Sequence, residues 1–457
     1  MKKVILSVGM WIMSFVCSQP AWADEASQLD NLQKQIEQMQ QNYESRINEL
    51  QTQVNELKEA QKTSTSSMEE VEEKVERVEE KTAGLTYEGR YEGAFEKGGL
   101  VAHDVAGFGD VTVGGYMDIE FENFQKTTST FDQHRFVINI GAELGERLRF
   151  YSEYEIEHGG TDAQGVGESK IEQAWVDFLA WKPLNFRAGE LLVPFGRFNM
   201  YHDSDLQDLV ERPLMARRVI PATWTESGAG FHGEFNPRLG SYEDLNIGYE
   251  AYFINGLNSG VSDSGFRSAR GSIETDNNNN KAIVSRWVLS PSIGHELGLS
   301  GYAGDFTSED DNILGGGVDF LTTWGPLEVL GDYAMFSVGD PTNERGVVTD
   351  TADNLRGGYL QANYHFWFDA LSDTVLGRSF ENPTFTLVGR FDWADLDDDS
   401  DTATSKDNQE HRWTLGLNYR PVESWVFKLE YQNNTTSKES LERGDNEGFL
   451  AGVAMGF

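Results

Sequence analysis

Residues 447–457, which read EGFLAGVAMGF, hold the pattern from which the fold of this chain follows. Apolar residues recur at every second position, so that one face of an extended strand carries Phe449, Ala451, Val453, Met455 and Phe457. A soluble protein seldom ends on an apolar strand without polar cover. A strand that closes a β-barrel inside a lipid bilayer can do so, because lipid covers its outer face and the first strand covers its edge.

The composition of the whole chain agrees with such a barrel. Of its 457 residues 12% are aromatic and 47 are glycine, and the formal net charge of −38 argues against nucleic-acid binding. Beyond the amino-terminal region no segment approaches the roughly 18 consecutive apolar residues of a transmembrane helix. The strands of a transmembrane barrel alternate apolar and polar residues and therefore give no such run.

The amino terminus has the three regions of a secretory signal peptide. A basic start at residues 1–3 precedes an apolar stretch of 13 residues, 4–16, and Ala21-Trp22-Ala23 is an A-x-A cleavage site. We expect residues 1–23 to be removed; the alternative is a membrane anchor, for which the apolar stretch is short. The single cysteine, Cys17, lies in the removed segment, so the mature protein has no disulfide and no cysteine metal site.

Residues 24–82 predict an α-helical coiled coil in the periplasm. Apolar residues recur at spacings of three and four from Leu29 to Leu57 and again from Met68 to Val78. A lone helix would expose this stripe, so we expect it to pair with copies of itself; the alternative is a single helix folded against a neighbouring domain. The Gly-rich connector that follows, residues 83–110, shows no sustained period and could plug, line or lead to the mouth of a barrel.

From residue 111 onward the period of the apolar residues changes to two, which is the period of strands. Short Pro- and Gly-containing turns alternate with long polar loops, as in outer-membrane barrels with tight periplasmic turns and longer external loops. The sequence therefore predicts an all-β transmembrane barrel of 16 antiparallel strands. The segments are Val111–Phe124, Arg135–Glu143, Leu148–Glu157, Lys170–Trp181, Asn185–Val193, Glu226–Phe235, Leu245–Asn255, Lys281–Leu289, His295–Phe306, Ile313–Thr323, Leu327–Val338, Asn354–Phe368, Thr384–Ala394, His411–Arg420, Trp425–Thr435 and Gly448–Phe457.

The two faces of the predicted strands differ. In the strand that starts at Trp425, Phe427 and Leu429 share one face, and Lys428 and Glu430 share the other. A lumen lined by unpaired charged residues cannot be a dry core, because each such group costs several kcal/mol, so we expect a water-filled channel. Five tryptophans fall where strands meet short turns and predict a periplasmic aromatic girdle: Trp181, Trp287, Trp324, Trp367 and Trp425.

Acidic residues gather in the predicted loops. Between residues 395 and 410 seven carboxylates stand against one lysine, Lys406. The plain interpretation is solvated loops on the cell surface. The alternative is that divalent cations bridge these carboxylates to the phosphates of neighbouring lipopolysaccharide.

The third external loop, residues 194–225, carries the most specific signal in the chain. Its start within RAGELLVPFGRFN (187–199), together with ERPL (211–214), resembles the phosphate-selective porins of the O and P type and related trimeric porins with an N-terminal coiled coil. The terminal Phe457 with its alternating neighbours is similar to the assembly signal of Gram-negative outer-membrane barrels. This resemblance implies a 16-stranded homotrimer in the outer membrane whose third loop folds inward and sets selectivity.

Within this loop we expect one or two helical turns over Asp203–Leu209, capped by Asp203 or Ser204. Two interpretations of the charged residues stay open. The arginines could give the pore a mild anion or carboxylate preference, or they could pair with nearby carboxylates and hold the loop rigid. The predicted constriction comprises Arg197, Asp203, Asp205, Asp208, Glu211, Arg212, Arg217 and Arg218, and the predicted pore wall contributes Arg149 and Arg412. The phosphate porins use rows of Arg and Lys, and no Lys-rich run occurs here.

No catalytic or cofactor motif stands out. The eight histidines are scattered without metal-ligand spacing, and G-x-S-x-G, Walker and C-x-x-C-H motifs are absent, so we expect no enzymatic activity, cofactor or metal. Two function classes remain. One is a passive diffusion channel for small hydrophilic solutes; the other is a structural protein whose coiled coil tethers the outer membrane to peptidoglycan. A stalked porin would do both.

Overall fold

The computed structural model describes residues 51–52, 85–88, 99–105, 109–160, 167–238, 245–261, 265–270, 276, 279, 281–307, 312–339, 354–396, 409–437 and 445–457. The chain divides into two units, Met1–Ala83 and Gly84–Phe457. The predicted signal peptide and, apart from the helical residues Gln51 and Thr52, the predicted coiled coil lie outside the described residues. Among the described residues no helix is both long enough and apolar enough to cross a bilayer.

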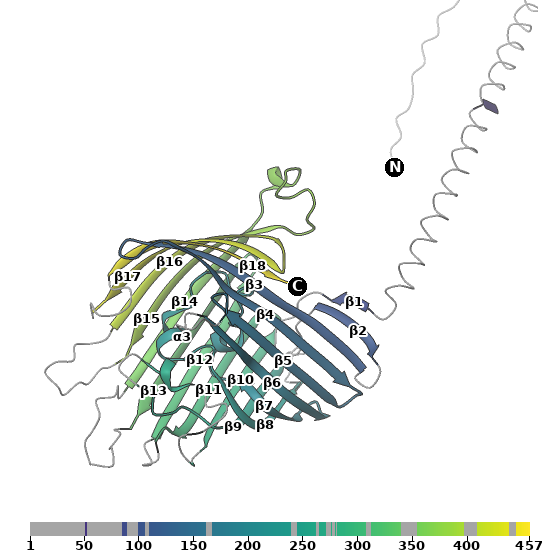
Figure 1. Cartoon of the computed structure of the whole chain (residues 1–457). Helices are drawn as coiled ribbons and strands as arrows, with labels where there is room; N and C mark the ends of the chain where they lie inside the picture. The colour runs from purple at the N-terminus through teal and green to yellow at the C-terminus, as the bar shows by residue number, and fades with distance from the viewer. Residues whose placement is uncertain are drawn as a thin grey trace, which may run out of the picture. The chain divides into compact units, whose positions relative to one another are not determined.

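Strands dominate the second unit and close into a barrel of sixteen (Figure 1). Each strand from β3 to β17 pairs antiparallel with the next, and β18 pairs with β3. All sixteen predicted strands are present, with ends that shift by a few residues. They are β3 (Gly109–Phe124), β4 (Thr130–Leu144), β5 (Leu148–Glu157), β6 (Glu168–Trp181), β7 (Leu184–Leu192), β8 (Thr225–Phe235), β9 (Asn246–Ile254), β10 (Ala282–Ser292), β11 (His295–Asp305), β12 (Asn312–Trp324), β13 (Leu327–Val338), β14 (Asn354–Phe366), β15 (Thr384–Asp395), β16 (Gln409–Val422), β17 (Trp425–Thr436) and β18 (Asn446–Gly456).

The carboxyl-terminal residue completes the seam of the barrel. The amide of Gly115 donates to the carbonyl of Phe457 at 3.0 Å, and the amide of Phe457 donates to the carbonyl of Gly115 at 2.9 Å. A Cβ on Gly115 would lie 2.1 Å from the carbonyl oxygen of Val137 and 3.1 Å from the Phe457 ring. Only glycine therefore fits where the last residue meets the first barrel strand.

The connector before the barrel contains two strands that the sequence did not predict. The start of β3 extends beyond β18, and its residues up to Val113 pair instead with β2 (Gly99–Val105), which in turn pairs with β1 (Leu85–Glu88). These strands have 4 and 7 residues, so they show too few periods to be recognised. They cover the edge of β3 that β18 leaves free, which would otherwise present unpaired amide and carbonyl groups.

The barrel has two ends, and aromatic side chains mark both on the outer face. At the end with short connections, the turn end, three of the five tryptophans of the predicted girdle lie at strand–turn junctions and are exposed: Trp181, Trp324 and Trp425. Trp287 lies inside β10, and Trp367 is half-buried. At the opposite end, the loop end, Phe131 and Trp413 are 78% and 63% exposed. Aromatic girdles at both ends, with an apolar band between them, are typical of the outer surface of a barrel in a bilayer.

The turn between β14 and β15, residues 367–383, is long for the turn end and contains the short helix η2 (Asp369–Leu371). Aromatic stacking fixes its base: the ring of Trp367 lies parallel to that of Phe385, with centroids 5.6 Å apart. The hydroxyl of Tyr419 also donates to the carbonyl of Leu376. The long turn is therefore attached to the outside of the barrel rather than folded across its opening.

The interior of the barrel contains an apolar cluster as well as polar groups. An apolar cluster fills part of the lumen, where Phe195 and Trp224 of the loop after β7 pack against Phe336 of β13, with ring centroids 4.8 and 6.4 Å from it. Tyr302 and Phe266 join the same cluster, with centroids 6.2 and 5.0 Å from Phe336. In this part of the lumen, apolar residues of an inserted loop are matched by apolar residues on the wall.

Candidate functional site

The connection between β7 and β8, residues 193–224, turns back into the barrel, and we call it the inner loop. Most of its side chains are buried, and Phe195, Met215 and Trp224 are fully so. It contains the short helices α2 (Arg197–Met200) and α3 (Leu214–Arg218), and α3 contacts β14, β15 and β16 (Figure 1). Its position inside the barrel agrees with what the family resemblance implies.

The one or two helical turns predicted over Asp203–Leu209 are present as a single isolated turn. The amides of Leu206 and Gln207 both donate to the carbonyl of Asp203, at 3.0 and 3.2 Å, and form a turn that is not continued as a helix. The two helices of the loop begin instead after Gly196 and Pro213. Asp and Ser bond the backbone in turns as well as at helix caps, so their presence could not distinguish the two.

Glycines on the lumen side of the wall give the inner loop room to lie flat. A Cβ on Gly452 of β18 would lie 3.0 Å from Val210, and a Cβ on Gly416 of β16 would lie 2.5 Å from Leu209. The same relation holds for Gly317 with Phe195 and for Gly357 with Met215 and Val219, all at 3.1 Å. The apolar side chains of the loop therefore enter sockets that larger wall residues would close.

Cationic side chains of the wall bond to carbonyl groups of the inner loop. The ammonium group of Lys428 donates to the carbonyl oxygens of Ser204 and Leu209, at 2.6 and 3.1 Å. The guanidinium group of Arg420 donates to the carbonyl of Asp205 at 2.8 Å. Such bonds satisfy main-chain groups that the loop cannot pair within itself, and buried main-chain groups without partners are costly.

Carboxylates of the wall complete this arrangement by accepting bonds from the amides of the loop. Charge-assisted bonds of this type each contribute about 1.5–3 kcal/mol. The wall thus holds the main chain of the loop from several directions. The contacts are Glu430 with Val210 at 2.8 Å, Asp392 with Leu214 at 3.2 Å and Asp332 with Phe198 at 3.2 Å.

Several of the arginines predicted at the constriction form ion pairs. Arg217 pairs with Glu211 of the same loop at 2.9 Å, and Arg218 pairs with Glu410 of β16 at 2.9 Å. Arg197 pairs with Glu296 of β11 and lies over the ring of Tyr201, the residue that follows α2. These contacts correspond to the interpretation in which arginines hold the loop in place.

The predicted acidic residues of the loop point into the protein rather than into open water. Asp203 and Asp205 are 3% and 1% exposed. Asp208 accepts a bond from Asn363 at 2.7 Å and lies 3.6 Å from the guanidinium group of Arg420. The carboxylates of this segment therefore contribute to loop docking more than to an exposed ring of negative charge.

The two predicted wall arginines occupy different environments. Arg412 is 2% exposed and donates to the carbonyl of Arg212 at 3.1 Å, so the inner loop covers it. Arg149 pairs with Glu143 at 3.1 Å and lines an open cavity at the turn end. Of the two, only Arg149 faces the solvent space of the barrel.

Arg212 of the inner loop belongs to a group that sequence reasoning missed, the arginine cluster of Arg212, Arg267 and Arg270. Their guanidinium groups converge on consecutive carbonyls of residues 221–223: Arg212 and Arg267 donate to Ala222, and Arg270 donates to its neighbours on both sides. In the described part of the chain none of the three forms an ion pair with a carboxylate. Arg267 and Arg270 come from the loop after β9, and no spacing rule connects that loop with the inner loop.

The pKa values of two arginines in the cluster are lowered, as expected where cations lie close together. Burial, together with the charges of Arg135 and Arg267, lowers the pKa of Arg212 to about 9. Burial and the charges of Arg270 and Arg217 lower the pKa of Arg267 to about 10. Both shifts leave the side chains charged at neutral pH and indicate a local excess of positive charge.

A cavity of about 820 Å³ opens at the turn end beneath the inner loop. Loop residues Tyr201, His202 and Asp203 contribute to its lining. Wall residues of both charges surround it, including Arg149, Arg187, Arg286, Glu250 and Glu296. The inner loop is therefore one boundary of a polar vestibule.

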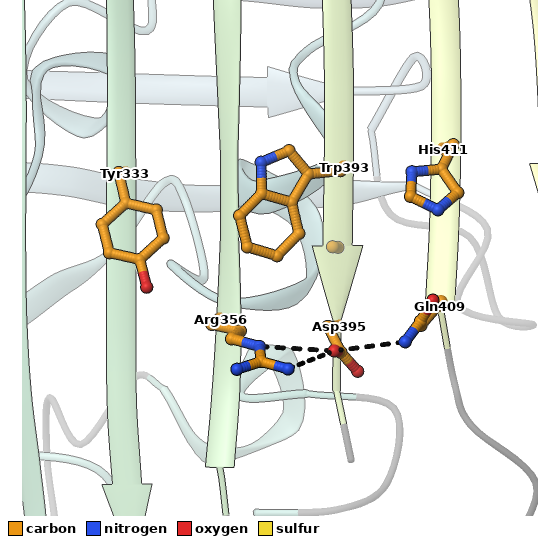
Figure 2. Close-up of a pocket in the computed structure, with 7 residues that line it drawn as sticks. Tyr333, Arg356, Trp393, Asp395, Gln409 and His411 are labelled. Carbon is orange, nitrogen blue, oxygen red and sulfur yellow. Dashed lines mark hydrogen bonds and ion pairs between the residues drawn. The ribbon is translucent and has the colours of Figure 1, made fainter. Parts of the chain in front are cut away.

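Figure 2 shows a second hollow, of about 380 Å³, at the loop end of β13 to β16. Tyr333, Trp393 and His411 line it, and Arg356 and Gln409 both bond to Asp395, at 3.0 and 3.4 Å. Trp393 shares the outward face of its strand with Phe391, whereas Asp392 points to the lumen. This hollow belongs to the outer aromatic ring and does not contribute to the lumen.

Comparison with known proteins agrees with the family resemblance of the sequence. Residues 111–320 match the family model of the phosphate-selective porins O and P. An uncharacterized protein of Aquifex aeolicus is 24% identical over 374 residues, which cover 76% of this chain and 80% of that protein.

Solved structures share the fold. OmpF of Salmonella typhi, in complex with daunomycin, matches with a TM-score of 0.52 and 11% identity, over 77% of this chain and 98% of that one. The outer-membrane channel DcaP of Acinetobacter baumannii matches with a TM-score of 0.50 and 12% identity, over 78% and 99%. Residues 111–320 of the chain therefore match the phosphate-selective porins O and P, and the chain has the barrel fold of outer-membrane porins.

Proposed function

We propose that this porin is a passive diffusion channel for small hydrophilic solutes in the outer membrane, with a mild preference for anions or carboxylates at the inner loop. The arginine cluster carries this proposal. It places three cations on the inner loop and its neighbour, and within the described residues no carboxylate pairs with them.

A local charge of this kind outweighs the overall charge of the chain. The net charge of −38 is distributed over 457 residues, and ions in the lumen are screened from distant charges within about 8–10 Å. Rings of side-chain charge at a narrow point set ion preference in channels. Arg267 is exposed and Arg270 is half-buried, so both are accessible to a passing anion.

The test is the reversal potential of single channels in a planar bilayer under a salt gradient. We expect the double variant Arg267→Ala, Arg270→Ala to shift the reversal potential toward cations. The double variant Arg267→Lys, Arg270→Lys keeps both charges and should stay close to the wild type. Arg378→Ala, in the long turn outside the lumen, is the control for unspecific charge effects. An unchanged reversal potential in the double alanine variant would remove the cluster from the filter.

The oligomeric state and surroundings follow from the family resemblance. We propose a homotrimer, held in contact with outer-membrane lipids and lipopolysaccharide, with the predicted coiled coil in the periplasm. Cross-linking of the detergent-solubilised protein followed by mass measurement tests the trimer, and a monomer under all conditions would contradict it.

A further inference from the structure

A bulge in β4 turns an unexpected histidine toward the lumen. The register of β3 with β4 pairs Asp118 with Arg135 but Glu120 with Asp132, so one residue of β3 faces two of β4. A β-bulge of this kind re-aims side chains, and bulges often occur next to functional sites. Here it brings His134 onto the inner face beside two carboxylates of β3.

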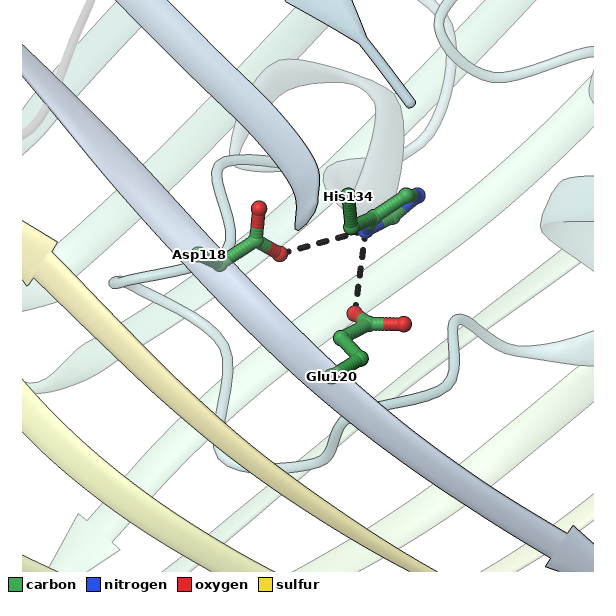
Figure 3. A group of neighbouring side chains, drawn as sticks. All are labelled: Asp118, Glu120 and His134. Atoms are coloured by element: carbon green, nitrogen blue, oxygen red, sulfur yellow. Dashed lines mark hydrogen bonds and ion pairs between the residues drawn. The ribbon is translucent and has the colours of Figure 1, made fainter. Parts of the chain in front are cut away.

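Figure 3 shows the resulting triad. The Nδ1 atom of His134 lies 3.1 Å from Oδ2 of Asp118 and 3.0 Å from Oε1 of Glu120. One potential ligand atom from each of the three residues falls within 4.8 Å of the others. Asp118 is 3% exposed, and its second carboxylate oxygen, Oδ1, is buried without a hydrogen-bond partner. The triad thus combines preorganised nitrogen and oxygen donors with unused acceptor capacity.

These separations suit a metal ion. Bonds of roughly 2.0–2.2 Å from zinc to nitrogen and oxygen place neighbouring ligand atoms about 3.0–3.4 Å apart at octahedral to tetrahedral angles. The two nitrogen–oxygen distances already lie within this range. The longer separation between the two carboxylates can close by rotation of Glu120, whose side chain is 12% exposed and sits on a flexible stem.

The surroundings add negative charge and a second imidazole. Asp132 accepts a bond from Nδ1 of His158 at 2.7 Å, and the rings of His134 and His158 are 5.5 Å apart. Two fixed cations nearby have other partners: Arg135 pairs with Glu155 and Glu157, at 3.1 and 3.4 Å, and Lys428 donates to two carbonyl groups of the inner loop. The two carboxylates of the triad therefore have His134 as their main cationic partner when no metal is bound.

We propose that Asp118, Glu120 and His134 bind one divalent transition-metal ion, such as Zn²⁺ or Ni²⁺, on the lumen wall. One imidazole with two carboxylates favours these ions over Ca²⁺ and Mg²⁺, which prefer all-oxygen ligands. The metal replaces the proton of His134, and water fills the remaining positions from the lumen side. The sequence rules for metal sites missed the triad because its ligands come from two strands and a bulge.

Direct binding tests this without relying on conduction. We expect the purified protein in detergent to bind one Zn²⁺ per chain in a calorimetric titration after removal of metals by a chelator. His134→Gln and Glu120→Gln each remove one ligand and should weaken the affinity at least about tenfold. His232→Gln is the matched control, because His232 also lies on the lumen wall and its ion pair in the described residues is with one carboxylate, Asp177, at 3.3 Å.

A spectroscopic measurement identifies the ligands. With Cu²⁺ as probe, the electron paramagnetic resonance spectrum should show coupling to one imidazole nitrogen, which disappears in His134→Gln and persists in His232→Gln. A heat-modifiability gel confirms that each variant is folded. The proposal is overturned if the wild type binds no Zn²⁺, or if His134→Gln and Glu120→Gln bind it as the wild type does. Either result leaves the proposed channel function untouched.

Discussion

At the scale of single residues, the charged groups of this barrel fall into two sets. One set holds the inner loop, as Lys428 does through two loop carbonyls. The other set has no carboxylate partner among the described residues, as in the arginine cluster. The sequence identified which residues are charged but not to which set each belongs. Arg412, predicted to line the pore, lies beneath the loop, whereas Arg267 and Arg270 were not singled out.

His202 provides a residue-scale prediction about pH. Its Nε2 lies 3.4 Å from the carboxylate of Glu172 on the wall. Burial disfavours the imidazolium, but the charge of Glu172 more than offsets this, so the pKa of His202 is raised. A raised pKa means that the pair stabilises loop docking fully below the ordinary value of about 6.5, and that this stabilisation is lost as pH rises through the raised pKa.

We therefore expect open-channel noise, a measure of loop movement, to increase as the pH is raised from neutral to alkaline. In His202→Gln the noise should depend less on pH, because the titrating group is gone. His365→Gln is the control, since His365 bonds to a threonine hydroxyl instead of a carboxylate. Equal pH dependence in wild type and His202→Gln would exclude this role.

At the scale of elements, two-residue periodicity was enough to locate all sixteen barrel strands, because lipid on one side and polar groups on the other impose it. The same signal failed for β1 and β2, which are too short to show it. It also failed inside the barrel, where the loop sockets depend on glycines facing particular loop residues. The bulge that turns His134 inward is likewise invisible to periodicity, since it changes the register rather than the composition.

The sockets lead to an element-scale prediction. Gly452→Leu would fill the space that Val210 of the inner loop occupies, so we expect the loop to shift and single-channel conductance to change. Gly389→Leu is the matched control, because a Cβ on Gly389 of β15 meets no atom within 4 Å. Unchanged conductance in Gly452→Leu, with the protein correctly folded, would contradict the socket argument.

At the scale of the whole molecule, closure of the barrel depends on one seam between its first and last strands. Gly115→Ala would place a methyl group 2.1 Å from the carbonyl of Val137 and against the Phe457 ring. We expect a much lower yield of heat-modifiable, folded barrel in refolding assays. Gly301→Ala, where a Cβ meets no atom within 4 Å, should refold like the wild type. Normal folding of Gly115→Ala would show that the seam tolerates a side chain.

The other whole-molecule prediction is that the predicted coiled coil binds peptidoglycan and is not needed for conduction. Deleting residues 24–82 from the mature protein should leave channel conductance in bilayers intact, while binding of the protein to purified peptidoglycan in a pull-down is lost. Retention of peptidoglycan binding by the shortened protein would exclude the tether. Loss of conductance would mean that the segment is needed to build the channel itself.

The wall grips the inner loop largely through main-chain amides and carbonyls, which every residue except proline provides alike. Loop side chains outside the sockets and the ion pairs can therefore be exchanged without releasing the loop. Anchoring of the loop and selectivity of the pore therefore depend on different groups. Substitutions in the loop could change which solutes pass while the barrel stays the same.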